Sequence, residues 1–347
     1  KENAFKLCEK LQRITVENNQ VYSSDTTGAL LNKGQTILYQ YPIGNEATTY
    51  TIPINVETIE SYAFEMNTLT TIEIERKVST IKKYAFESSV NLKKVTIGKT
   101  IQTIEQDAFR YCYSLESFEV AKDNIKYQSI EGVLFEKNEE GKAITLIQYP
   151  SKKTTYTKYY VPETVTTIKT LAFDNVTALE TIIMSTKTTT IGEKAFIRLT
   201  NLVDLYYPST TPITQTNIIN ECGKAVVKIP LKQEYATREG YEFKQILTVG
   251  NCSEYSSETY SLFIFDASEG YKTLTIYGNS GITTNVNWKT IVSQIESVLI
   301  EEGITKISDN IFKDHTTLKT ISIPSSAIQI GNYILRGCTS LTSISIA

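Results

Sequence analysis

The hydrophobic positions of this chain repeat with a period of 22 or 23 residues. In residues 80–120, TIKKYAFESSVNLKKVTIGKTIQTIEQDAFRYCYSLESFEV, an isoleucine precedes an Ala-Phe pair, and a leucine and two alternating apolar residues follow. The isoleucine recurs at Ile59, Ile81, Ile104, Ile168, Ile191, Ile307 and Ile330. The bulky residue of the pair recurs at Phe64, Phe86, Phe109, Phe173, Phe196, Phe312 and Leu335, with a shortened first copy at Phe5.

The end of each repeat is typical of a half-buried strand. In TIEI, Ile72 and Ile74 point to one face and Thr71 and Glu73 to the other, because side chains alternate along a strand. The same triplet ends every copy, including the first one at Leu11, Ile14 and Val16. The shorter V-x-T-I segment, such as Val56 to Ile59, predicts a second strand, and the Ala-Phe pair predicts a turn closed against the interior.

One repeat has too few apolar side chains to offset the entropy of ordering its backbone. The repeats therefore fold only if neighbours stack, share a core and complete each other's strand hydrogen bonds. We expect a β-rich solenoid, a curved stack with a parallel sheet along one face.

The repeats resemble the BspA-like, or Treponema pallidum-type, leucine-rich repeat family of surface proteins. The matching segments are TIESYAFEMNTLTTIEI, TIEQDAFRYCYSLESFEV and QIGNYILRGCTSLTSISI. The resemblance implies a right-handed leucine-rich repeat solenoid with few short helices. It also implies a cell-surface or secreted protein that adheres to host cells or matrix proteins.

Two similar segments, residues 16–42 and 120–150, interrupt the array. Each predicts an inserted β-hairpin, because two apolar runs flank a polar turn that contains glycine. The expected strands are Gly28–Leu31 and Ile37–Tyr41 in the first insert, and Val133–Glu136 and Ile144–Tyr149 in the second.

A third interruption extends from Pro208 to about Gly270 and predicts a strand and a helix over Lys232–Glu239. We therefore expect a first array with its insertions and terminal strand-helix segment in residues 1–250. A start cap and a second array follow in residues 251–347, with Trp288 covering the apolar edge of the first coil. Both ends of the sequence lie inside repeats, so we expect a fragment or a trimmed chain.

The composition and the missing motifs argue against several classes of function. The 347 residues carry a net charge of -3, which indicates neither nucleic acid nor an anionic membrane as a partner. No apolar run is long enough to span a bilayer. With a single histidine and no CxxC, GxSxG, HExxH or GxGxxG motif, we expect no enzyme, no cofactor and no metal.

The cysteines and the histidine occupy two kinds of place. His315 and three cysteines fall three residues after the bulky residue of the pair; the cysteines are Cys8, Cys112 and Cys338. Because different repeats have different residues at this turn position, we interpret all four as structural. Cys222 and Cys252 lie outside this position and either form a disulfide or remain two thiols. Asn175 and Asn251 match the acceptor pattern for N-glycosylation.

The outward positions of the strands form the candidate ligand-binding face, because solenoids bind through exposed sheet surfaces. Ile183 and Tyr206, on neighbouring coils, are candidates for an adhesive patch. The full row is Arg13, Thr15, Thr71, Glu73, Glu75, Lys94, Thr96, Ser117, Glu119, Thr181, Ile183, Asp204 and Tyr206.

Three hypotheses remain open. The first is a non-enzymatic adhesion or protein-binding solenoid at a cell surface or outside the cell. Its partner would be a protein of host cells or the extracellular matrix. The second is a carbohydrate-binding module in which tyrosines, 22 in this chain, stack on sugar rings. The third is a structural spacer that projects another domain.

Overall fold

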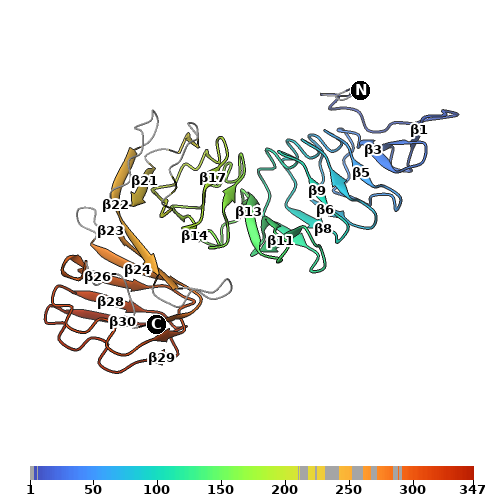
Figure 1. Cartoon of the computed structure of the whole chain (residues 1–347). Coiled ribbons are helices and arrows are strands. Elements are labelled where there is room, and N and C mark those ends of the chain that lie inside the picture. Colours follow the sequence, from blue (N-terminus) through green and yellow to red (C-terminus); the bar gives the residue numbers. More distant parts are fainter. Residues whose placement is uncertain are drawn as a thin grey trace. The chain divides into compact units, whose positions relative to one another are not determined.

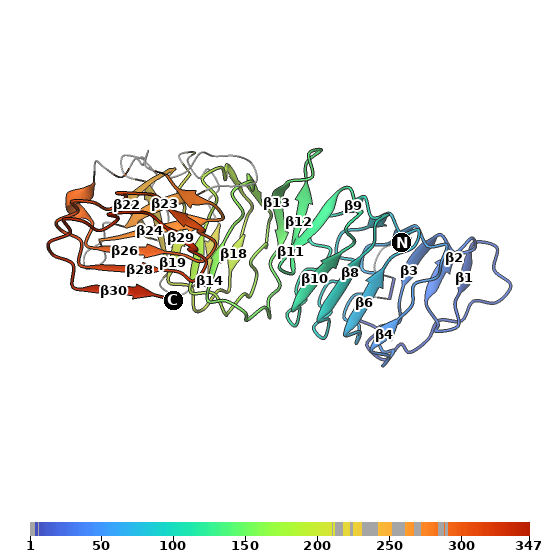
Figure 2. The same cartoon turned by 90° about the horizontal axis from the view of Figure 1, so that it is seen from below.

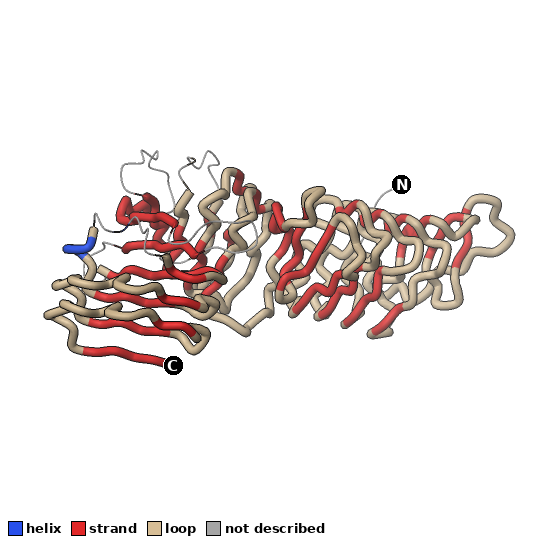
Figure 3. Tube along the Cα trace, turned by 60° about the horizontal axis from the view of Figure 1, so that its bottom comes forward, coloured by secondary structure: helices blue, strands red, loops and turns tan. Residues whose placement is uncertain are grey.

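The computed structural model describes residues 4–5, 7–209, 211, 218–222, 225–230, 242–251, 261–266, 272–283, 288 and 291–347. These residues divide into two compact units. The first contains residues 1–205, 211–226 and 237–242, and the second contains residues 206–210, 227–236 and 243–347. Almost all of the described chain is strand or turn, and one short 3-10 helix, η2 (Val292–Gln294), interrupts it (Figure 3). The expected helix over residues 232–239 lies outside the described residues.

The first unit is a stack of coils, each coil being one repeat, and the leucine-rich repeat solenoid is confirmed (Figure 1). The triplet forms a parallel sheet in which each strand pairs with the same positions of the next coil. Side chains alternate along it as predicted, with Ile72 and Ile74 buried and Thr71 and Glu73 exposed. Its strands are β4 (Thr49–Tyr50), β6 (Thr71–Ile74), β8 (Lys94–Ile97) and β10 (Ser117–Val120) (Figure 2).

The short V-x-T-I segments form a second sheet on the same coils. It begins antiparallel in the first insert and continues with parallel two-residue strands. Its order is β1 (Tyr22–Ser24), β2 (Leu30–Asn32), β3 (Ile37–Gln40), β5 (Thr58–Ile59), β7 (Thr80–Ile81) and β9 (Thr103–Ile104).

Both sheets end with the coil of residues 101–120; one new sheet begins within the second insert and another begins after it. One contains β11 (Tyr127–Ile130), β12 (Val133–Lys137), β13 (Ala143–Gln148), β15 (Thr167–Ile168) and β17 (Thr190–Ile191). The other includes β14 (Lys158–Tyr160), β16 (Thr181–Ile183) and β19 (Asp204–Tyr206). The short strands β18 (Phe196–Ile197) and β20 (Ile219–Asn220) pair with each other, and β21 spans Val226–Pro230.

The two inserts are hairpins as predicted, but each carries a third antiparallel strand, β1 or β11, that the sequence pattern did not indicate. They are built alike. The side chains of Asn19 and Asn124 each accept two backbone N–H bonds from the residues two and three positions later. The polar composition of both third strands hid them, because they lack the apolar alternation of a half-buried strand.

Stacked aromatic rings fill the centre of the first unit. Phe64, Phe86 and Phe109 follow one another at centroid distances of 4.8 and 5.1 Å. At the start of each stack in this unit, a tyrosine from the insert takes the place of the phenylalanine: Tyr41 packs against Phe64 and Tyr149 against Phe173, both at 5.5 Å. The predicted closure of the Ala-Phe turn against a shared interior is thus confirmed, since Phe64, Phe86 and Phe109 are at most 1% exposed.

The first copy of the repeat departs from the pattern. Residues 11–16, all of them described, form no strand, and Leu11 and Ile14 are only half-buried. The backbone N–H of Ile14 instead donates to the Gly28 carbonyl of the insert, at 3.0 Å. The prediction of a triplet strand was therefore wrong here, because the insert rather than a neighbouring coil takes its hydrogen bonds.

The second unit has its own core and sheets. Its larger sheet includes β22 (Glu242–Asn251), β23 (Ser261–Asp266), β24 (Thr273–Gly278), β26 (Ser297–Ile300), β28 (Thr320–Ile323) and β30 (Ser343–Ile346). The smaller one contains β25 (Gly281–Ile282), β27 (Lys306–Ile307) and β29 (Gln329–Ile330). Trp288 is fully buried between Phe263 and Phe312, at ring distances of 5.3 and 5.7 Å. Trp288 stacks on Phe312, which belongs to the first repeat that the sequence shows in the second array, and its role as a start cap stays a prediction.

Candidate functional site

The predicted ligand-binding face is assembled most completely on β6, β8 and β10. Thr71, Lys94 and Ser117 are in register across the three strands, and so are Glu73, Thr96 and Glu119. These side chains point away from inward residues of which five are at most 1% exposed: Ile72, Ile74, Val95, Ile97 and Phe118. Glu75 follows β6 and is exposed as well.

This face is polar and shallow. The Lys94 ammonium lies 2.6 Å from the Glu119 carboxylate, and both side chains are well exposed to solvent. A small groove of about 250 Å³ lies along its first strands, lined by Thr49, Thr71, Glu73, Glu75 and Arg76 among others. Such a surface is suited to hydrogen bonding with another macromolecule rather than to enclosing a small molecule.

The remaining predicted positions are not gathered into this face. Thr181, Asp204 and Tyr206 lie on β16 and β19, beyond the break in the sheets, and Arg13 and Thr15 are exposed but lie on no strand. Ile183 is only 4% exposed, so its predicted role in an adhesive patch was wrong. It stands in register with Tyr160 on the neighbouring strand.

The turn position of the cysteines has a structural role. The thiol of Cys112 donates to the Phe86 carbonyl of the preceding coil at 3.1 Å, and Cys338 donates likewise to Phe312. Ser89 makes the equivalent bond to Phe64 at 2.8 Å. Burial raises the pKa of Cys112 to about 12, so this thiol is not a nucleophile at neutral pH.

Cys222 belongs to the same position, and its placement outside the repeat was wrong. Its thiol donates to the Phe196 carbonyl at 3.2 Å, and the N–H of Phe196 donates to Ile218. Ile218 and Ile219 therefore replace the Ala-Phe pair, a substitution that concealed the coil in the sequence. Cys222 is a free thiol in this structure, whereas Cys252 lies outside the described residues, so their pairing stays a prediction.

His315 is structural, with a ring packed at 5.7 Å from Phe312, and burial lowers its pKa. Within the described residues, no three His, Cys, Asp or Glu side chains gather as metal ligands. Asn175 is half-buried in a turn, and the side chain of Asn251 is outside the described part, so glycosylation stays a prediction.

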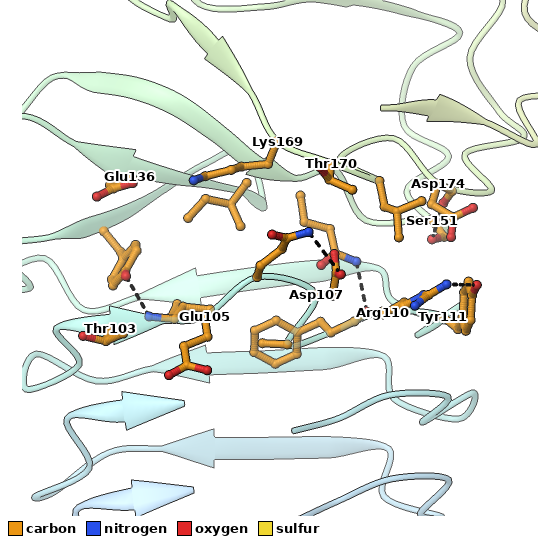
Figure 4. A pocket seen from close by; sticks show the side chains of 18 of the residues that line it. Thr103, Glu105, Asp107, Arg110, Tyr111, Glu136, Ser151, Lys169, Thr170 and Asp174 are labelled. Atoms are coloured by element: carbon orange, nitrogen blue, oxygen red, sulfur yellow. Dashed lines mark hydrogen bonds between the residues drawn. The ribbon is translucent and has the colours of Figure 1, made fainter. Parts of the chain in front are cut away.

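A pocket that the sequence did not indicate lies at the break between the coil of residues 101–120 and the second insert. It has a volume of about 340 Å³. Figure 4 shows its two walls: Thr103, Glu105 and Asp107 come from the coil before the break, and Lys169 and Thr170 lie opposite. The pocket exists because β9 ends its sheet, while β13 pairs with β12 of the insert instead of with β9.

Two side chains of the insert bridge this break. The Tyr127 hydroxyl accepts the N–H of Ile104 at 2.8 Å, and the amide of Gln148 donates to the Phe109 carbonyl at 3.3 Å. Burial raises the pKa of Tyr127 to about 12, so its hydroxyl stays protonated.

Charged and aromatic side chains gather where Asp174 and Tyr113 line the pocket, and Arg198 lies beside them. The Arg198 guanidinium binds both carboxylate oxygens of Asp174, at 2.5 and 2.6 Å, and lies about 5.5 Å from the Tyr113 ring. Arg110 packs over the Tyr111 ring at 4.4 Å. Burial raises the pKa of Asp107 and of Asp174, although Arg198 opposes this for Asp174.

The sequence matches the BspA type leucine-rich repeat region in 6 copies, over residues 43–160, 145–228 and 287–347. These segments cover well over half of the chain. The chain belongs to the BspA-type leucine-rich repeat family. Such repeat proteins in general present extended surfaces that bind other proteins, and no enzyme family is indicated.

No curated protein matches this sequence significantly. Solved structures similar to this chain include a leucine-rich repeat protein from Eubacterium ventriosum, 17% identical, with 93% of this chain and 94% of that one covered and a TM-score of 0.47. A leucine-rich cell surface protein from Faecalibacterium prausnitzii is 17% identical, with coverage of 96% and 94% and a TM-score of 0.33. The pneumococcal vaccine antigen PcpA is 16% identical, with coverage of 96% and 73% and a TM-score of 0.37.

Proposed function

We propose that this BspA-type repeat protein is a non-enzymatic adhesion protein, displayed on a cell surface or secreted, that binds a protein of host cells or the extracellular matrix. The observation that carries the proposal is the face of β6, β8 and β10. There, polar side chains stand in register over a core that packing holds rigid. A rigid polar surface binds a partner without the entropic cost of ordering its own loops.

The family supports surface location, and no described helix has the length and apolarity to cross a bilayer. Location is tested by antibody labelling of intact, unpermeabilised cells that produce the protein. Labelling of intact cells supports the proposal, and labelling only after permeabilisation contradicts it.

Binding is tested with purified protein on a panel of immobilised matrix proteins and cultured host cells. Thr96→Trp places a bulky side chain at the centre of the face, and Asn91→Trp, at an exposed turn, is the matched control. We expect Thr96→Trp to lower binding at least about tenfold, since interface centres carry most of the affinity. Equal binding by both variants, or binding to a glycan array with none to proteins, contradicts the proposal.

A further inference from the structure

Neighbouring coils are joined at the Ala-Phe corner by two backbone hydrogen bonds. The N–H groups of Phe64 and Met66 donate to the carbonyls of Ala85 and Glu87, at 2.7 and 2.9 Å. The next junction repeats this arrangement at 2.8 and 2.9 Å, with Phe86 and Ser88 as donors and Ala108 and Arg110 as acceptors. Each corner thus offers two donors, two residues apart, to two carbonyls that are also two residues apart.

A third bond joins the short strands, where the carbonyl of Ile81 accepts the N–H of Glu105 at 2.9 Å. The coil of residues 101–120 carries the equivalent groups on its far side: the N–H groups of Phe109 and Tyr111 and the carbonyl of Ile104. None of these three groups has a partner in the part of the protein that the structure describes. Phe109 is 1% exposed, and buried backbone N–H groups are rarely left unpaired.

All three residues line the pocket of about 340 Å³ at the break. Its volume lies within the range of about 300–1,000 Å³ that ligand pockets occupy. Ala108, Ile147 and Leu171 supply apolar lining. Asp107 and Lys169 supply charges of both signs on opposite walls (Figure 4). The pocket therefore combines backbone donors, a backbone acceptor and apolar lining.

We propose that this pocket binds a short extended peptide segment of a partner protein in place of the missing coil. Two carbonyls of the peptide, two residues apart, accept from Phe109 and Tyr111, and one peptide N–H donates to the Ile104 carbonyl. The apolar lining receives the side chain between the two carbonyls. Recognition is by backbone hydrogen bonds, as in peptides that add to an open sheet edge. The site is separate from the face of β6, β8 and β10, and does not depend on it.

The probe is a blocked pentapeptide, acetyl-Leu-Ala-Phe-Asp-Asn-amide, which copies the corner at residues 171–175. In the intact corner, the carbonyl of Ala172 accepts the N–H of Tyr149 at 2.7 Å, and the carbonyl of Asp174 accepts the side-chain hydroxyl of Ser151 at 2.9 Å. We expect saturable binding by titration calorimetry with a Kd between about 1 μM and 1 mM. We also expect slower amide exchange at Phe109 and Tyr111. An analogue whose alanine carbonyl is reduced to a methylene should bind at least about tenfold more weakly, since it lacks one acceptor.

Two variants block the pocket: Gln106→Trp, at an exposed position of the lining, and Thr170→Trp, on the opposite wall. Each should weaken peptide binding at least about tenfold, and Thr96→Trp on the sheet face should leave it unchanged. Failure of matrix binding alone thus leaves this site standing. No binding at millimolar peptide, unchanged binding in both folded pocket variants, or binding of cellotriose in place of the peptide would overturn the proposal.

Discussion

Two junctions between neighbouring coils of the same array are built differently. The first joins the coils of Phe86 and Phe109, and the second joins the coils of Phe109 and Tyr149. At the first junction both sheets continue, the rings stack at 5.1 Å and the backbones of the corners are bonded. At the second, both sheets end, and the Tyr127 and Gln148 side chains replace part of the backbone bonding. An insert can therefore keep the core of a solenoid buried while it interrupts the sheets and leaves a pocket at the surface.

The largest effect should come from the regular junction. Phe86 is fully buried between two stacked rings, so Phe86→Ala removes both contacts and leaves a cavity. We expect a loss of about 3–5 kcal/mol in the free energy of unfolding, measured with denaturant. A loss below about 1 kcal/mol would contradict continuous stacking.

A double-mutant cycle provides the control for this comparison. Phe64 and Phe86 should couple by about 0.5–1.5 kcal/mol, the value for aromatic pairs. Phe109 and Tyr149, whose rings make no stacking contact in the described structure, should show a coupling near zero.

The pH dependence of stability tests how side chains join coils. Glu163 is 2% exposed, accepts the N–H of Thr186 on the next coil at 3.1 Å, and has its pKa raised by burial to about 7. Between pH 4.5 and 7 the folded state holds a proton that the unfolded state releases, so stability falls as the pH rises. Glu163→Gln should remove this slope and stabilise the protein by up to about 3 kcal/mol at pH 8, with little change at pH 4.

Glu302 is the matched control in the second unit. It accepts the equivalent N–H of Ser325 at 3.0 Å but is exposed, and its side-chain bond to Ser325 lowers its pKa. The ionised Glu302 carboxylate therefore stabilises the folded state, and this stabilisation is lost as the pH falls through the acidic range. If the free energy of unfolding rose from pH 5 to 7 in a way that depends on Glu163, the raised pKa of the Glu163 carboxyl would be contradicted.

A smaller effect is expected where the insert bridges the break. Tyr127→Phe removes the hydroxyl that accepts from Ile104, which should cost about 1–2 kcal/mol because a partly buried donor loses its partner. Tyr22→Phe changes the corresponding tyrosine of the first insert, which is 39% exposed. Its cost should stay below about 0.5 kcal/mol by thermal or denaturant unfolding. Equal costs would mean that the bridge at the break contributes nothing.

Much of the fold could be predicted because the hydrophobic pattern can be recognised within each single repeat. The Ala-Phe pairs and the triplets predicted the buried corners, the parallel strands and the outward row on β6, β8 and β10. Two inserts were visible as interruptions. Each of these features is local to one repeat, where alternation and turn residues determine the backbone.

The features that were missed depend on neighbours. Ile183 is buried although alternation along its strand predicts an outward position, and the coil of Cys222 was hidden because Ile218 and Ile219 replace the usual pair. The pocket arises where coils fail to meet, which no single repeat encodes. The face of β6, β8 and β10 was predicted from alternation within single repeats. The proposed peptide site became visible only from backbone groups that are unpaired between two coils.

Amide hydrogen exchange, read residue by residue by NMR without any ligand, tests the difference between the two junctions most directly. We predict that the amides of Phe86 and Ser88, bonded across the regular junction, exchange at least about tenfold more slowly than those of Phe109 and Tyr111. Equal protection of the two pairs would show that the backbone is bonded across both junctions, and would contradict the open break.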